Sequence, residues 1–154
     1  DFLTVPAGKP IQGSLKQGDA QQALDVSVEP GEFATVVGLG NGKELRLVTL
    51  REQPDDFNAL KASLAFYSLD GSCANAGLQA AGRNVDIFKD VAEGSLQRRS
   101  INPLKLSVQL RCGGAAVGQP LDLGQLAAGQ RYTLFLVPSA QGPRLFQAVD
   151  NLAN

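Results

Sequence analysis

The chain has 154 residues, 44% of them hydrophobic, and a formal net charge of −1, so it is long enough for one large or two small domains with a packed core. The near-neutral charge gives no electrostatic reason to expect a nucleic acid partner. Histidine is absent, which excludes a Ser-His-Asp or Cys-His catalytic arrangement and a His-containing zinc site made from this chain alone. No run of 18 apolar residues occurs, so we do not expect the sequence to span a membrane. Because it begins at Asp1 without a methionine, we expect a signal peptide that is absent from this chain.

The first fifty residues alternate between short apolar stretches and turn residues. Such alternation predicts strands rather than helices, and we expect them at 11–16, 23–28, 32–38 and 43–50. The glycine-rich stretch 38–43 has neither the spacing of a phosphate-binding loop nor a helix after it. Its Asn41-Gly42 pair instead favours a tight hairpin turn.

Residues 51–58, REQPDDFN, interrupt this rhythm with charged side chains and Pro54. A charged, proline-containing segment without alternation is typical of a linker between domains. We therefore expect an N-terminal domain over 1–50, a linker over 51–58 and a C-terminal domain over 59–154. The acidic pair Asp55-Asp56 belongs to this linker and is interpreted as a solvated spacer rather than as catalytic carboxylates.

The region after the linker has the size of one immunoglobulin-like sandwich. Its clearest strand is 104–111, in which every second residue is apolar, as expected for a half-buried strand of an antiparallel sheet. Further strands are predicted at 61–69, 84–88, 131–137 and 144–149. The fold class is therefore all-β.

Two distant stretches, 23–39 and 120–136, resemble each other. Each has an apolar-Asp-apolar step, then an apolar residue three positions before a glycine (Gly31 or Gly129), then a threonine four positions after it. Each is predicted to be a β-hairpin. Residues 2–9 also resemble 87–95, so we expect two tandem immunoglobulin-like β-sandwich domains, the first truncated at its N-terminus. Chance similarity between alternating strands and glycine turns is the alternative.

Cys73 and Cys112 are the two cysteines of the chain. In a β-rich protein of secreted character two cysteines are expected to pair, and the bond would indicate an oxidising compartment. The alternative is two buried free thiols in a cytosolic protein.

Arg98 and Arg99 form the one adjacent cationic pair in the sequence, on a predicted turn before the strand 104–111. Two guanidinium groups can bind carboxylates of a partner protein or of an acidic sugar. Phe57 is a candidate for the apolar centre of the same partner-binding surface. For the aromatic residues near it, packing in the core is the alternative. For the two arginines, the alternative is a solvated loop. No catalytic, cofactor-binding or metal-binding residues are predicted.

Several phrases within 52–137 resemble the AlgF family, namely EQPDDFNALKASLAFYSLDGSCANAGL, IFKDVAEGSLQRRSINPLKLSVQLRC and LDLGQLAAGQRYTLFLV. The resemblance implies a periplasmic protein of two β-sandwich domains, required for O-acetylation of the exopolysaccharide alginate. It also implies partners: the periplasmic acetyltransferases and the membrane-bound acyltransferase of the same pathway. A related protein occurs in cellulose-acetylating systems, so the polymer stays open.

The sequence thus leads to the hypothesis of a non-enzymatic periplasmic adaptor that works through protein–protein contacts and needs no cofactor. A weak contact with polysaccharide is also expected. The alternative is a carbohydrate-binding module for an acidic polysaccharide, although the chain has no tryptophan and two tyrosines with which to form an aromatic platform. An enzyme is the third hypothesis, and the absence of histidine argues against it.

Overall fold

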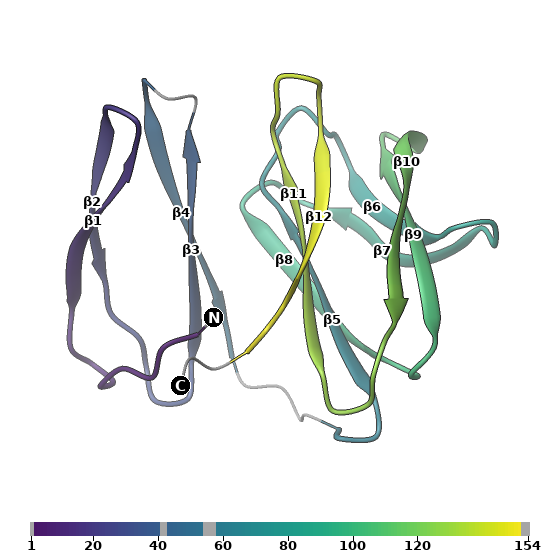
Figure 1. Ribbon diagram of the computed structural model, residues 1–154, viewed down its shortest axis with the longest axis horizontal. Coiled ribbons are helices and arrows are strands. Elements are labelled where there is room, and N and C mark those ends of the chain that lie inside the picture. The colour runs from purple at the N-terminus through teal and green to yellow at the C-terminus, as the bar shows by residue number, and fades with distance from the viewer. Residues whose placement is uncertain (1, 41–42, 54–57, 152–154) are drawn as a thin grey trace. The chain divides into compact units, whose positions relative to one another are not determined.

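The computed structural model describes residues 2–40, 43–53 and 58–151, which consist of β-strands and turns without a helix in those ranges (Figure 1). Contacts between residues divide the chain into two compact units, one holding β1–β4 and the other β5–β12. The all-β fold with a sandwich-like arrangement of sheets is confirmed. The proposed division at residues 51–58 stays a prediction, because positions 54–57 lie outside the described residues and β4 extends to Glu52.

The N-terminal unit contains two antiparallel two-stranded sheets. β1 (Ile11–Gln17) pairs with β2 (Ala20–Val26), and β3 (Phe33–Gly40) pairs with β4 (Leu45–Glu52). Arg51 connects β4 to the segment between β2 and β3, since its Nη1 donates to the Ser27 carbonyl at 2.9 Å and to Glu32 Oε2 at 2.8 Å.

The C-terminal unit contains two four-stranded sheets. The first has the strand order β10-β9-β6-β7 and is antiparallel throughout. The second has the order β12-β11-β5-β8, in which the central pair β5 and β11 is parallel. The strands are β5 (Ala62–Ser68), β6 (Ala76–Ala80), β7 (Val85–Val91), β8 (Ser95–Ile101), β9 (Lys105–Cys112), β10 (Ala115–Gln125), β11 (Arg131–Val137) and β12 (Arg144–Val149).

The hydrophobic core of this unit is built from alternate residues of both sheets. β9 contributes Leu106, Val108 and Leu110, which are the alternating residues that the sequence indicates. The core also contains Ala62, Leu64, Phe66, Cys73, Ala76, Leu78, Phe88, Val91, Leu123, Leu126, Tyr132, Leu134 and Leu136. Because burial of one large apolar side chain stabilises a fold by about 1.5–3 kcal/mol, this cluster is the main source of stability of the unit.

The predicted hairpins at 23–39 and 120–136 are wrong. β10 and β11 belong to different sheets, and so do β2 and β3. The physical reason lies in the apolar residue before each glycine: Leu126 is fully buried and Val28 is also buried, whereas a tight hairpin turn would expose them. Gly31 and Gly129 still share a left-handed backbone, with φ of 77° and 76°, so both stretches turn in a similar way. The tandem origin and the truncation of the first copy stay predictions.

Candidate functional site

The cysteines are joined. Cys73, in the turn before β6, forms a disulfide with Cys112 at the end of β9, and their Cα atoms are 4.9 Å apart. The predicted disulfide is confirmed. It cross-links a segment entering the first sheet to a central strand of that sheet and closes a loop with a sequence separation of 39 residues.

Arg98 and Arg99 lie on strand β8 and not on the predicted turn. Adjacent residues of a strand point to opposite faces, so the two guanidinium groups do not act as a pair. Arg98 Nη2 forms an ion pair with Asp150 Oδ2 at 3.1 Å, with both side chains less than a tenth exposed. Thr133 Oγ1 donates to Asp150 Oδ1 at 2.8 Å, and Arg98 Nη1 donates to Ser63 Oγ at 3.2 Å. Arg98 therefore belongs to a buried polar network of the second sheet.

Arg99 joins the two sheets at their edges. Its Nη1 donates to the backbone carbonyl of Ile87 on β7 at 2.7 Å, and Gln97 Nε2 donates to the carbonyl of Lys89 on the same strand at 3.2 Å. These bonds hold the edge strand of one sheet against the edge strand of the other. Whether Arg98 or Arg99 binds a partner stays a prediction.

Phe57, the third predicted partner-binding residue, lies outside the described residues. Of the neighbouring aromatic residues, Phe66 packs in the core, where its ring centroid is 5.9 Å from that of Phe88. On the other face of the same sheet, Phe135 lies between Tyr67 and Phe146, with ring centroids 5.0 and 5.2 Å away.

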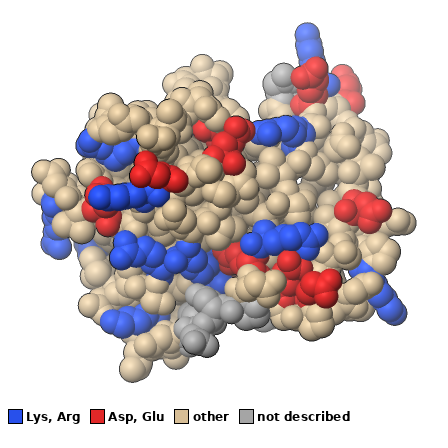
Figure 2. All heavy atoms as spheres, turned by 180° about the vertical axis from the view of Figure 1, so that it is seen from behind, with Lys and Arg blue, Asp and Glu red and all other residues tan. Residues whose placement is uncertain are grey.

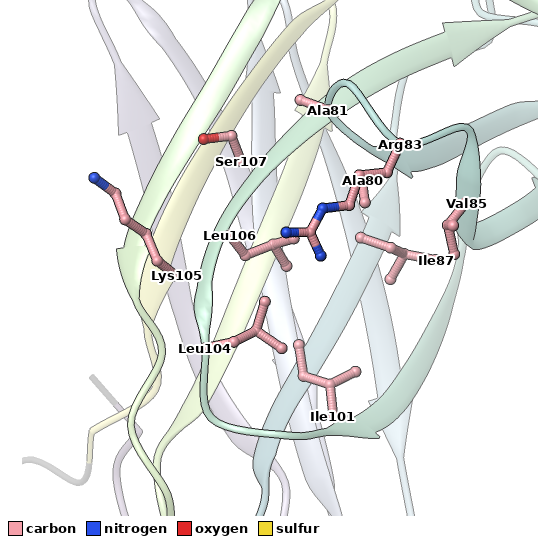
Figure 3. A pocket seen from close by; sticks show the side chains of 10 residues that line it. All are labelled: Ala80, Ala81, Arg83, Val85, Ile87, Ile101, Leu104, Lys105, Leu106 and Ser107. Atoms are coloured by element: carbon pink, nitrogen blue, oxygen red, sulfur yellow. The ribbon is translucent and has the colours of Figure 1, made fainter.

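A cavity of about 550 Å³ lies between the β6–β7 turn and the segment from the end of β8 into β9 (Figure 3). Its walls are aliphatic, with Ile87, Ile101, Leu104 and Leu106 presenting their side chains to a common space. The remaining lining residues are Ala80, Ala81, Arg83, Val85, Lys105 and Ser107. Cavities of this volume accommodate small ligands or a few apolar side chains of a binding partner.

Two cations border this cavity. The guanidinium group of Arg83 reaches over the aliphatic side chains, whereas the ammonium group of Lys105 points away from them (Figure 3). Neither residue belongs to a motif that would mark it as functional in the sequence. Arg83 lies in the stretch QAAGRNVDIF between Gly82 and Asn84, which is typical of a turn, so no local signal distinguishes it from an ordinary exposed arginine.

A second, polar hollow of about 350 Å³ lies over β6, β7 and β9, and Asp86 and Lys89 line it together with Gln79 and Arg111. Lys89 Nζ is 2.7 Å from Asp86 Oδ2, and Gln79 Nε2 donates to Asp86 Oδ1 at 2.7 Å. The bond from Lys89, followed by that from Gln79, lowers the pKa of Asp86, and the carboxylate in turn raises the pKa of Lys89. The hollow can offer both donors and acceptors to a polar ligand.

The described residues hold no group of three or more His, Cys, Asp and Glu side chains that could ligate a metal. Within the same ranges, no helix has the length and apolar character needed to cross a bilayer. Lys and Arg side chains are interspersed with Asp and Glu over the face shown in Figure 2. The chemistry available at both hollows is recognition through apolar contact, hydrogen bonds and local charge.

The fold and these sites define a disulfide-linked all-β protein with an apolar and a polar hollow on its C-terminal sandwich. Its sequence is 32% identical over 139 residues to the alginate biosynthesis protein AlgF of Pseudomonas aeruginosa, and the match covers 90% of this chain and 59% of that protein. The chain is therefore similar to AlgF over most of its own length. It spans about three fifths of the length of that relative.

A structural similarity was also found, to the C-terminal domain of AlgF from Pseudomonas aeruginosa. It has a TM-score of 0.49 and 28% sequence identity, and covers 59% of this chain and 99% of that domain. No protein-family model matches the sequence.

Proposed function

We propose that this protein is a non-enzymatic periplasmic adaptor that acts in alginate biosynthesis, where it binds the enzymes that O-acetylate the polymer. The observation that carries the proposal is the similarity to AlgF over 90% of the chain. The partners we propose are the periplasmic acetyltransferases and the membrane-bound acyltransferase of the pathway.

Two features of the chain support this proposal. The disulfide between Cys73 and Cys112 suits the oxidising environment of the periplasm. The chain lacks histidine, the residue most often used as a general base, while its C-terminal sandwich offers an apolar cavity bordered by Arg83 and Lys105. Such a combination favours binding of another protein over group transfer by this chain.

The test is a deletion strain in which the acetyl content of secreted alginate is measured. We expect acetylation to be lost while polymer secretion continues, and to return with the wild-type gene. The purified protein should bind the purified acetyltransferases in a pull-down and should release no acetate from an acetyl-ester reporter. Normal acetylation in the deletion strain, or turnover of the reporter, would contradict the proposal.

Arg99 provides a narrower test of the predicted partner-binding residues. Arg99→Glu reverses its charge at an exposed position, whereas reversal at Arg98 would leave Asp150 facing a buried negative charge and would destabilise the fold. Because Arg99 also donates to the Ile87 carbonyl on β7, Arg99→Gln, which removes the charge without reversing it, is the control. A pull-down that is weakened more by Arg99→Glu than by Arg99→Gln, with both variants folded, would support the predicted role. An unchanged pull-down would remove Arg99 from the partner-binding surface.

A carbohydrate-binding module is the second candidate, and the polar hollow with Gln79, Asp86, Lys89 and Arg111 favours it. Amide, carboxylate and guanidinium groups are those that bind sugar hydroxyls and carboxylates. Titration of the labelled protein with mannuronate oligosaccharides would separate the candidates. Saturable NMR shifts confined to these residues support sugar binding, and their absence supports the adaptor.

A further inference from the structure

The aliphatic cavity beside the β7–β8 edge of the C-terminal sandwich has the features of a binding site. Arg99 and Gln97 hold β8 against β7, and the cavity lies where Ile87 of β7 and Ile101 of β8 face the following segment. Val85, which also lines the cavity, is 58% exposed. Contact between apolar surface and water is unfavourable. A partner that covered this hollow and the exposed Val85 would therefore be stabilised by burial of apolar surface.

The charge beside this cavity indicates what covers it. Within the described ranges the Arg83 guanidinium makes no hydrogen bond or ion pair, and it lies over the aliphatic walls (Figure 3). Lys105 adds a second positive charge at the rim. A guanidinium in a partly apolar setting binds a carboxylate with two parallel hydrogen bonds.

We propose that this cavity binds a segment of a partner protein that carries an aliphatic side chain next to an aspartate or glutamate. The aliphatic side chain fills the space between Ile87, Leu104 and Leu106, and the carboxylate pairs with Arg83. The proposal rests on the adaptor function and names the surface and the chemistry that carry it out.

The lining of the cavity favours a peptide over a sugar. Sugar rings stack on aromatic side chains, and the lining residues include no aromatic ring. The volume of about 550 Å³ is enough for a few aliphatic side chains, the usual anchors at the centre of a protein interface. A bound lipid is a separate outcome that the experiment distinguishes.

The experiment is photocrosslinking in the native bacterium. The photoreactive residue p-benzoylphenylalanine replaces Val85 in the full chain, and in a control it replaces Leu60, which is 78% exposed and does not line the cavity. We expect Val85→p-benzoylphenylalanine to give a discrete protein adduct that the control does not give. Mass spectrometry of the adduct should place the crosslink within a segment that contains an aliphatic residue beside Asp or Glu.

A charge reversal tests the carboxylate contact. The peptide identified by the crosslink is titrated against the full chain, and Arg83→Glu is expected to weaken its affinity by about tenfold or more, because it places like charges opposite each other. Arg144→Glu makes the same change of charge on the exposed start of β12 and should alter the affinity by less than about twofold. Neither variant should change the melting temperature.

The outcomes separate this proposal from the adaptor function. If Val85 crosslinks no more than Leu60 while the acetyltransferases still bind in a pull-down, the cavity is not the docking site and the adaptor function stands. Crosslinking to a lipid or to polysaccharide also overturns the proposal. If the wild-type protein does not bind the acetyltransferases in the pull-down, the adaptor function itself is overturned.

Discussion

At the scale of single residues, the network around Asp150 shows how a polar face can stabilise a sheet. Asp150 follows β12, Arg98 lies on β8 and Thr133 lies on β11, so one carboxylate connects strands from the centre and both edges of the second sheet. A mostly buried ion pair is costly to break, because the charge that stays has been taken out of water and loses the partner that offset this cost.

Asp150→Ala should therefore lower the free energy of unfolding by about 3 kcal/mol, as expected for a broken buried ion pair. Thr133→Val removes one hydrogen bond while the ion pair stays, and should cost about 1 kcal/mol. Urea denaturation of the three proteins measures both values. Equal losses in the two variants would mean that the ion pair adds nothing to the hydrogen bond.

Asp86 should titrate below the ordinary aspartate value of 3.8, because Lys89 and then Gln79 donate hydrogen bonds to its charged form. Since its pKa is lowered in the folded state, its contribution to stability is present above the pKa of the unfolded chain. That contribution is lost as the pH falls through the folded pKa. The carboxyl carbon shift followed by NMR gives the midpoint.

Two lysine variants provide the comparison for Asp86. Lys89→Gln should raise the pKa of Asp86 toward its ordinary value, because it removes the charged hydrogen bond from Lys89 that lowers this pKa most. Lys105→Gln removes a lysine that does not line the polar hollow and should leave the midpoint unchanged. A midpoint that responds equally to both variants would show a general charge effect instead of the hydrogen bond.

At the scale of elements, strands that alternate between apolar and polar residues could be predicted from the sequence. β11 and β12 have the bounds that the alternation predicts, and β9 is displaced by one residue. β8 was missed because it is polar on both faces: Arg98 pairs with Asp150, 52 residues away, and Arg99 bonds to the backbone of β7. No local pattern indicates such distant partners.

The cavity could not be predicted for a related reason. It requires the β6–β7 turn of one sheet to lie beside the end of β8 in the other, and this adjacency follows from the packing of the two sheets. β6 itself, with the sequence AGLQA, consists largely of residues that are depleted in strands. The disulfide, by contrast, could be predicted, because the chain has two cysteines and the β-rich pattern suits a secreted protein.

Gly77 on β6 should not tolerate alanine. A Cβ atom at this position would lie 2.9 Å from the backbone oxygen of Phe88, at the irregular pairing of β6 with β7. Gly77→Ala should lower the free energy of unfolding by about 1–3 kcal/mol, as expected for overpacking. Gly13→Ala, on β1, meets open space and should cost less than about 0.5 kcal/mol in the same thermal or urea unfolding experiment. A neutral Gly77→Ala would mean that β7 moves freely away from β6.

The disulfide should contribute about 4 kcal/mol to the stability of the C-terminal unit, from the loop entropy of a 39-residue separation. The double variant Cys73→Ala/Cys112→Ala should lose most of this value, and reduction of the wild-type protein should lower its melting temperature similarly. Calorimetry under oxidising and reducing conditions measures the difference. A double variant as stable as the oxidised protein would show that the cross-link is dispensable for the fold.

At the scale of the whole molecule, the two units differ in the sources of stability available to them. The C-terminal unit has two four-stranded sheets, a continuous core and the disulfide. The N-terminal unit has two two-stranded sheets, with Val26, Val28 and Leu50 among its buried residues. Isolated two-stranded sheets are marginally stable in water, whereas larger sheets packed face to face are stable by themselves.

This difference predicts which part of the chain folds alone. A fragment of residues 58–154 should give a dispersed amide NMR spectrum and one cooperative unfolding transition, because its core cluster lies entirely within it. A fragment of residues 1–53 should give a spectrum with little dispersion. Loss of dispersion in the longer fragment would show that its core depends on the first 53 residues, and would contradict the proposal of two separate domains.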